Sequence, residues 1–275
     1  MNARTATTAR VLPGFRWSLG WTLAYLTLLV LVPLGATFAR ASSLGWSEFV
    51  DAVWTERARA AYRVTFGASL AASLASVALG LLVAWVLVRY PFPGRRLVDS
   101  LVDLPFALPT AVAGLVYSDL YVEKGWFGRH LVPPGIHGAY SWLAIVLVLV
   151  FIGVPFVVRT VQPVLAEIDA DVEEAAACLG ATRWQTFRHV LLPMILPAAV
   201  TGFALAFARS LGEYGSVVFV SGNMPYRTEI APVLIVSRLE EFQYAEATAI
   251  AVVLLVFSFT LLVGINLLER WSRHE

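Results

Sequence analysis

Lysine and cysteine are almost absent from this sequence. Lys124 is the only lysine among 275 residues, and the other basic side chains are arginines. A phosphate-binding P-loop ends in Gly-Lys-Ser or Gly-Lys-Thr, whereas Lys124 lies in Glu-Lys-Gly. The chain therefore has no P-loop of its own. Cys178 is the only cysteine, which excludes an internal disulfide.

Charge is scarce as well. Only 14% of the residues are charged, whereas a soluble domain carries about a quarter. The net charge of +1 gives no sign of a nucleic-acid partner. The four histidines are scattered, and no pair has metal-ligand spacing with acidic support. The sequence thus predicts no metal site, no catalytic residues and no cofactor bound by this chain.

Long charge-free windows are abundant. A membrane-spanning helix needs about 20 mostly apolar residues. Windows of this kind cover 17–39, 64–88, 138–158, 190–208 and 247–268, and a shorter one covers 104–118. The pattern predicts an all-α polytopic membrane protein with about six transmembrane helices. With no linker, low-complexity tract or repeat, residues 1–275 are predicted to form one domain.

The first window permits two interpretations. Arg4, Arg10 and Arg16 precede it, and Ala39-Arg40-Ala41 resembles a cleavage site, as in a signal peptide. The apolar stretch from 17 to 39 exceeds the usual signal-peptide length of about 7–15 residues. We favour a retained membrane anchor.

Arginine placement indicates the orientation. With six spans, the two tails and the loops on their side carry eleven basic residues, and the opposite side carries eight. Basic residues favour the cytoplasmic side. We therefore expect both termini in the cytoplasm.

The longest loop on the cytoplasmic side, residues 159–193, has the pattern of two helices. Asp171 is a possible N-cap with Glu174 three residues later. One apolar face is predicted to contain Val172, Ala175, Ala176 and Leu179. Gly180 is expected to end this helix in the left-handed conformation.

A second helix is predicted to begin at Thr182, with Gln185 completing a capping box. Its apolar face contains Trp184, Phe187 and Leu191. Two roles remain open from composition alone. The loop is either a docking surface, with small residues that let another protein approach, or a pair of helices that packs under the bundle.

A charged pair lies in the fifth predicted span, just after the charge-free window 190–208. Arg209 and Glu213 are four residues apart, which predicts a shared helix face. They are either a self-neutralising structural pair or part of a path for a hydrated anion. In the second case Arg209, Ser210 and Tyr214 would offer hydrogen-bond donors, and Glu213 would weaken the hold of Arg209 on the anion.

Prolines interrupt the short third window. Pro105 and Pro109 each remove a backbone donor and disturb the carbonyl four residues earlier. Carbonyls repel anions, so we assign these prolines a shaping role. Asp103 is expected near the cytoplasmic membrane edge.

The loop at 159–193 resembles the EAA loop of ABC importer permeases. Glu174-Ala175-Ala176, Gly180, Val190 and Leu192-Pro193 match its pattern, with Val190 where the family has Ile. The resemblance implies that Glu174, Ala175, Ala176, Leu179 and Gly180 couple the permease to an ATP-binding subunit. It also implies that this partner binds the ATP and Mg.

The second half of the chain resembles the sulfate and molybdate group of these permeases. The similar segments are 103–114, 207–215, 221–232 and 235–240, and the last two are similar to T-type subunits of sulfate/thiosulfate importers. The resemblance implies an inner-membrane import subunit that transports sulfate or thiosulfate. Its expected partners are a second, W-type permease chain, two ATP-binding subunits, a periplasmic or lipid-anchored sulfate-binding protein, and membrane lipid. The alternatives are a molybdate or other oxyanion permease of the same group, and a secondary anion transporter.

Overall fold

The computed structural model describes residues 14–272, and its described residues contain helices and no strands. Five helical stretches are long and apolar enough to cross a membrane: Phe15–Ala41, Glu56–Arg89, Trp142–Glu167, Arg183–Leu211 and Tyr244–Ile265. They correspond to five of the six predicted windows. Arg4, Arg10 and Arg273 of the basic ends lie outside the described residues.

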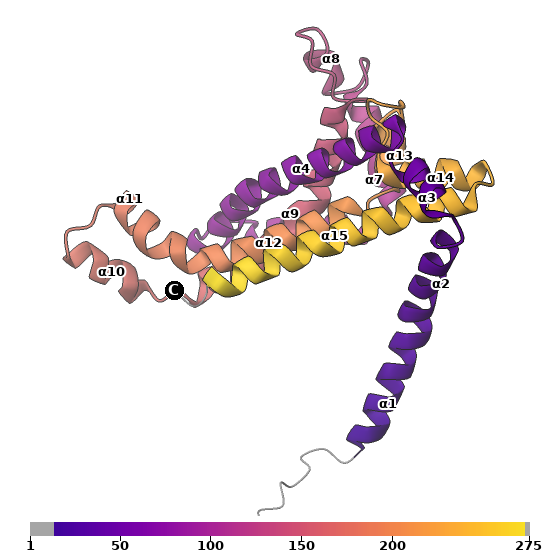
Figure 1. The fold of residues 1–275 in the computed structure, drawn as a ribbon. Helices are drawn as coiled ribbons and strands as arrows, with labels where there is room; N and C mark the ends of the chain where they lie inside the picture. The colour runs from indigo at the N-terminus through magenta and orange to yellow at the C-terminus, as the bar shows by residue number, and fades with distance from the viewer. Residues whose placement is uncertain (1–13, 273–275) are drawn as a thin grey trace, which may run out of the picture.

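The first membrane helix contacts the bundle only near its C-terminal end, and the rest of it projects away (Figure 1). It consists of α1 (Phe15–Leu26), a π-helical turn η1 (Thr27–Leu31) and α2 (Val32–Ala41). Pro33 at the start of α2 has no N–H for the preceding turn, which accounts for the local widening. None of its most apolar window is buried within this chain, so membrane lipid or another subunit must cover it.

Three long helices form the centre of the bundle: α4 (Glu56–Arg89), α9 (Trp142–Glu167) and α12 (Leu192–Leu211). Their close approach depends on small side chains. A methyl group at Gly80 would lie 2.7 Å from Val157 Cβ, and one at Gly153 would lie 2.6 Å from Ser76 Oγ. Ala68, Ala72 and Ala84 continue the buried stripe along α4.

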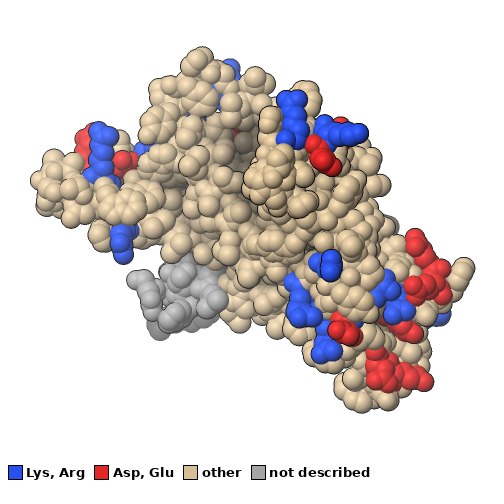
Figure 2. Space-filling model, turned by 90° about the horizontal axis from the view of Figure 1, so that it is seen from above, with Lys and Arg blue, Asp and Glu red and all other residues tan. Residues whose placement is uncertain are grey.

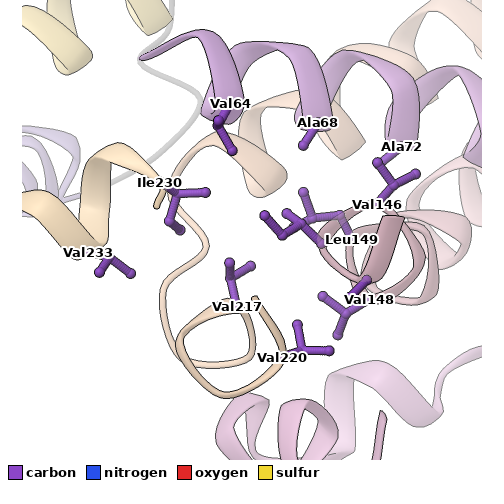
Figure 3. Packing of buried hydrophobic residues seen from close by; sticks show 12 residues of the cluster. Val64, Ala68, Ala72, Val146, Val148, Leu149, Val217, Val220, Ile230 and Val233 are labelled. Carbon is purple, nitrogen blue, oxygen red and sulfur yellow. The ribbon is translucent and has the colours of Figure 1, made fainter. Parts of the chain in front are cut away.

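A compact apolar cluster fills the bundle near the start of α9 (Figure 3). Val64, Ala68 and Ala72 of α4 face Ile145, Val148 and Leu149 of α9 there. The third contributor is the segment after α12, with Val217 and Val220 of α13 (Val217–Val220) and Ile230. This packing fixes residues 212–230 against the bundle.

The third predicted window is not one helix. It forms α6 (Leu104–Ala107) and most of α7 (Thr110–Tyr121), and α5 (Arg95–Val102) precedes it. Leu108, the residue before Pro109, is extended, with φ −82° and ψ 134°. A proline disfavours helical geometry at the residue before it, which breaks the helix here.

The remaining helices lie mainly at the two ends of the bundle. We call the end with α10 (Ala170–Cys178), α11 (Arg183–Thr186) and the π-helical turn η2 (Phe187–Leu191) the loop end. The far end carries α3 (Trp46–Val53), α8 (Gly128–Leu131) and α14 (Ala231–Glu240), and α15 (Tyr244–Ser272) runs back along the bundle (Figure 1). Figure 2 shows charged side chains gathered toward the ends, with uncharged surface between them.

Candidate functional site

At the loop end, the helix that carries the Glu-Ala-Ala sequence ends as the sequence predicts. Gly180 has φ +82°. The Gly180 N–H donates to the Ala177 carbonyl (2.9 Å), and the Ala181 N–H donates to the Ala176 carbonyl (3.0 Å). This pair of bonds is a Schellman motif. The left-handed glycine therefore fixes the angle between α10 and the following helix.

The start of α10 differs from the prediction. Asp169, not Asp171, is the N-cap residue, and its side chain makes no capping bond. Asp171 and Glu173 lie in the first turn instead, where their charges favour the positive end of the helix dipole. The helix thus begins two residues earlier than expected and still has its acidic first turn.

The predicted apolar face of α10 is divided between the bundle and solvent. Ala176 is buried, whereas Ala175, Glu174 and Gly180 are exposed, and Leu179 is 88% exposed. The surface expected to touch an ATP-binding subunit is therefore largely uncovered in this chain. That arrangement fits a docking helix better than a pair of helices that packs under its own bundle.

The second loop helix is anchored more firmly. Thr182 and Gln185 form the predicted capping box, with Thr182 N–H donating to Gln185 Oε1 at 2.8 Å. Phe187 packs edge-on against Trp85 of α4, with ring centroids 5.7 Å apart. Leu191 is buried, while Trp184 is exposed. This helix continues through η2 into α12, so the second loop helix and the bundle helix form one continuous helical segment.

An ion pair also joins α10 to the bundle. Arg89, the last residue of α4, has Nη2 2.8 Å from Glu173 Oε1. The Arg89 guanidinium lies over the Trp85 ring, 5.6 Å from its centroid. Because Trp85 also contacts Phe187, the two loop helices meet the same end of α4.

Near the far end, Arg209 and Glu213 form the predicted ion pair, with 2.5 Å between Nη1 and Oε2. They do not share a helix face as expected, because α12 ends at Leu211 and Gly212 is its C-cap residue. Glu213 folds back from the turn onto the last helical turn. The helix thus ends at Gly212, between the two partners.

The two partners have different environments. The Glu213 side chain is 2% exposed, while that of Arg209 is 37% exposed. The second carboxylate oxygen of Glu213 accepts bonds from Ser216 N–H and Ser216 Oγ, both at 2.9 Å. Glu213 is therefore fixed in the protein, whereas Arg209 retains N–H groups that have no acceptor among the described residues.

The other two predicted path residues, Ser210 and Tyr214, differ in burial. Tyr214 is 36% exposed, next to the buried Glu213. Ser210 is buried, and its Oγ has no hydrogen-bond partner within the described part of the chain. The structure thus places Arg209 and Tyr214 at a surface and Ser210 inside the bundle.

Helix α7 approaches this turn closely. A methyl group at Gly114 would collide with the Ser216 carbonyl, and one at Gly215 would collide with Thr110 Oγ1. Ser118 Oγ donates to the Phe219 carbonyl at 3.0 Å. The helix that begins after Pro109 therefore lies against residues 212–219, consistent with the shaping role assigned to the prolines.

Sequence reasoning missed two ion-pair groups. At the loop end, Arg159 donates to Asp103 at 2.6 and 2.8 Å and to Asp99 at 2.7 Å. This bond holds the pKa of the Asp99 carboxyl below its usual value of 3.8, although partial burial acts in the opposite direction. Asp103 is thus an ion-pair partner of Arg159 of α9, at the loop end of the bundle.

At the far end, Arg57 donates to both carboxylate oxygens of Glu229, at 2.9 and 2.7 Å. Glu229 is 3% exposed. The two residues are 172 positions apart, so no local spacing could have revealed the pair.

Comparison with known proteins agrees with this arrangement. The family model described as "Binding-protein-dependent transport system inner membrane component" matches residues 76–274. The chain is 49% identical over 265 residues to the "Sulfate transport system permease protein CysT" of Salmonella typhimurium, covering 96% of each chain. It is 50% identical over 258 residues to the protein of that name from Synechocystis, covering 93% of this chain and 90% of the relative.

Solved structures share the fold at lower identity. A chain from the crystal structure of a bacterial alginate ABC transporter superposes with a TM-score of 0.75, at 20% identity and 93% coverage of both chains. A chain of the MetNI methionine ABC transporter superposes with a TM-score of 0.55, at 21% identity, covering 82% of this chain and 95% of the other.

Proposed function

Because the chain belongs to the family of binding-protein-dependent transport system inner membrane components, we propose that it is a permease subunit of an ATP-driven importer of sulfate and thiosulfate. The observation that carries the substrate is the 49% identity to a sulfate permease over 96% of both chains. As a transport component with several membrane helices, the chain supplies part of the path that the substrate follows and catalyses no reaction.

Helix α10 is the proposed contact with the ATP-binding subunit. Four residues of this helix and its C-terminal cap are exposed and free to meet a partner: Glu174, Ala175, Leu179 and Gly180. Ala176 is buried against the rest of this chain. ATP and Mg are bound and used by the partner. When the ATP-binding subunits close, α10 moves, and the Arg89–Glu173 and Trp85–Phe187 contacts pass that motion to α4 and α12.

The proposed path passes Arg209. An oxyanion that sheds part of its hydration in the membrane needs positive charge and hydrogen-bond donors. Arg209 and Tyr214 are accessible, and the unpaired Ser210 hydroxyl lies next to Arg209 in the chain. Glu213 already occupies one side of the guanidinium, which keeps the arginine from holding an anion too tightly for release.

The path requires a second membrane subunit. We propose a W-type permease chain, two ATP-binding subunits and a periplasmic or lipid-anchored sulfate-binding protein as the rest of the importer. The uncovered first membrane helix supports a larger assembly, because none of its most apolar window is buried within this chain.

Cys178 offers a direct test of the orientation, in which both termini lie in the cytoplasm. It is the only cysteine and it is exposed in α10. A membrane-impermeant maleimide should label it in inside-out vesicles and not in intact spheroplasts. Labelling in spheroplasts alone would reverse the orientation.

Uptake in a deletion strain tests the substrate. Cells without this subunit should lose sulfate uptake and grow on cysteine as the sulfur source, and a plasmid copy should restore uptake. Loss of molybdate uptake instead would reassign the cargo within the same group. Uptake that persists without the ATP-binding subunit and stops with a proton ionophore would favour a secondary transporter.

Gly180 tests the coupling role. Open space surrounds the position of a Cβ there, so only the backbone resists a side chain. A β-branched residue is strained at φ +82°, whereas asparagine tolerates this conformation. Gly180→Val should lower uptake at least about tenfold with normal membrane levels, and Gly180→Asn should retain most uptake. Equal uptake by the two variants would contradict the role.

A further inference from the structure

A deep groove lies on the side of the bundle where α4, α12 and α15 meet. Its volume is about 990 Å³, within the range of small-molecule sites. Phe203 and Phe207 of α12 belong to its lining and stack 5.8 Å apart. Phe66 of α4 and Phe257 of α15 also line it, with centroids 6.1 Å apart. Most of this lining is aromatic or aliphatic.

One end of the groove is polar. Arg59, Tyr62, Arg63 and Phe66 follow one another at i, i+3, i+4 and i+7, so they share one face of α4. Neither arginine has a carboxylate partner among the described residues. Tyr62 is 9% exposed, and its hydroxyl has no hydrogen-bond partner in the described part of the protein. Apart from a 3.4 Å bond from Arg63 Nε to the Arg59 carbonyl, the two guanidinium groups and the phenol have no acceptor within the described part of the chain.

Two features indicate that the polar end of the groove lies at the membrane interface. Trp54 lines the groove just before α4, and tryptophan is enriched at the headgroup level. Helix α4 has 34 residues, about 50 Å at 1.5 Å per residue, and exceeds the roughly 30 Å hydrocarbon core. Because Trp54 lies directly before α4, we assign its first turns to the headgroup region.

The apolar part runs from this level into the hydrocarbon region. Its lining on α15 begins at Val253 and ends at Ile265. Twelve residues of helix span about 18 Å, close to the extent of an extended lipid chain. The groove thus combines a phosphate-like site at the interface with an apolar channel of acyl-chain length.

We propose that this groove binds an anionic glycerophospholipid from the membrane leaflet at the far end. Arg59 and Arg63 bind its phosphate, the Tyr62 hydroxyl donates to a phosphate or ester oxygen, and one acyl chain lies along Phe66, Phe207 and Phe257. Glu56 also lines the mouth, and the two arginines leave a net charge of +1 there. An anionic headgroup fits this charge, whereas an apolar helix of another subunit would leave three donors unpaired.

Native mass spectrometry of the purified permease assembly tests the proposal. After delipidation, palmitoyl-oleoyl phosphatidylglycerol should bind more tightly than the matching diacylglycerol, which has no phosphate. The double variant Arg59→Gln with Arg63→Gln should lower phosphatidylglycerol binding at least about tenfold. Arg227→Gln is the matched control, because Arg227 is an exposed arginine outside the groove. Glu56→Gln should strengthen binding. Equal binding of the two lipids, or no effect of the double variant, would overturn the proposal.

Crosslinking in native membranes identifies the occupant directly. Leu70 lines the groove and is 46% exposed, so it accepts p-benzoylphenylalanine with little disturbance. Irradiation should give an adduct of phospholipid mass, which the double arginine variant should lose. An adduct with the mass of a second protein chain would show that a helix covers the groove and would refute the lipid site.

Discussion

Glu213 and Glu229 have nearly the same burial and opposite roles. Their side chains are 2% and 3% exposed, and each has one arginine partner. Arg57 reaches Glu229 from α4 and uses Nε and Nη2 together. Arg209 reaches Glu213 from four residues away through Nη1. The first pair ties distant segments together, while the second is local.

The arginines show what this difference means. The Arg57 side chain is 24% exposed and also donates weakly to Ser237 Oγ at 3.4 Å, so its groups are committed to the fold. Arg209 is the more exposed of the two, and Glu213 is held independently by Ser216. A buried carboxylate with its own local support leaves N–H groups of its arginine open, which the proposed cargo role requires.

The largest effect should come from breaking the distant pair. Arg57→Gln leaves the buried Glu229 carboxylate without its cation, which costs about 3 kcal/mol in the free energy of unfolding. The melting temperature of the detergent-solubilised protein should fall clearly. Arg227→Gln, which removes an exposed arginine of the same end, should leave it unchanged.

Arg57→Gln combined with Glu229→Gln sharpens this test. The neutral pair removes the uncompensated charge and should recover much of the lost stability. If Arg57→Gln alone melts like the parent protein, the pair does not hold the far end together.

The local pair should affect transport more than stability. Arg209→Ala should lower uptake at least about tenfold, or about 1.4 kcal/mol, because the path loses its positive charge. The double variant Arg209→Ala with Glu213→Ala separates the roles. Stable protein without uptake would assign Arg209 to the cargo. Stable protein with normal uptake would make the pair structural, like Arg57 and Glu229.

Breaking a third ion pair, at the loop end, should lower uptake less than breaking the Arg209–Glu213 pair. Arg89 and Glu173 are 22% and 37% exposed, and pairs of this kind contribute about 0.2–1 kcal/mol. Glu173→Ala should lower uptake about twofold, and the swap Arg89→Glu with Glu173→Arg should restore it. Failure of the swap with normal protein levels would mean that the contact with Trp85, not the charge, carries the coupling.

The contrast between local and distant pairs also explains what the sequence could predict. Arg209 and Glu213 were paired from their spacing, and Gly180 and the Thr182–Gln185 box were located from helix-end rules, because these interactions lie within a few residues. Arg57–Glu229 and Arg159–Asp103 join separate helices, and their pairing depends on how the bundle packs.

The predictions that the structure corrects failed for reasons that also divide into local and long-range ones. Asp169 replaced Asp171 as the N-cap because both acidic residues suit a helix start. The third window became two helices because Pro109 disfavours helical geometry at Leu108, an effect that hydropathy does not register. The division of the α10 face between bundle and solvent could not be predicted, because periodicity shows an apolar face without showing what covers it.

The smallest expected effect concerns the partly exposed pair of Asp99 and Arg159, whose side chains are 39% and 33% exposed. The Arg159 guanidinium lowers the pKa of Asp99 in the folded protein below its ordinary value of 3.8. The stabilising contribution of Asp99 is therefore fully present above that value and is lost as the pH falls through the lower, folded pKa. Asp99→Asn keeps the size of the side chain and removes its titration. The melting temperature of the parent protein should exceed that of Asp99→Asn by a constant small amount between pH 7 and pH 5. The difference should shrink below about pH 4. A difference that persists unchanged at pH 3 would show that hydrogen bonding to Gln162 and Arg159, rather than the carboxylate charge, accounts for the effect of Asp99.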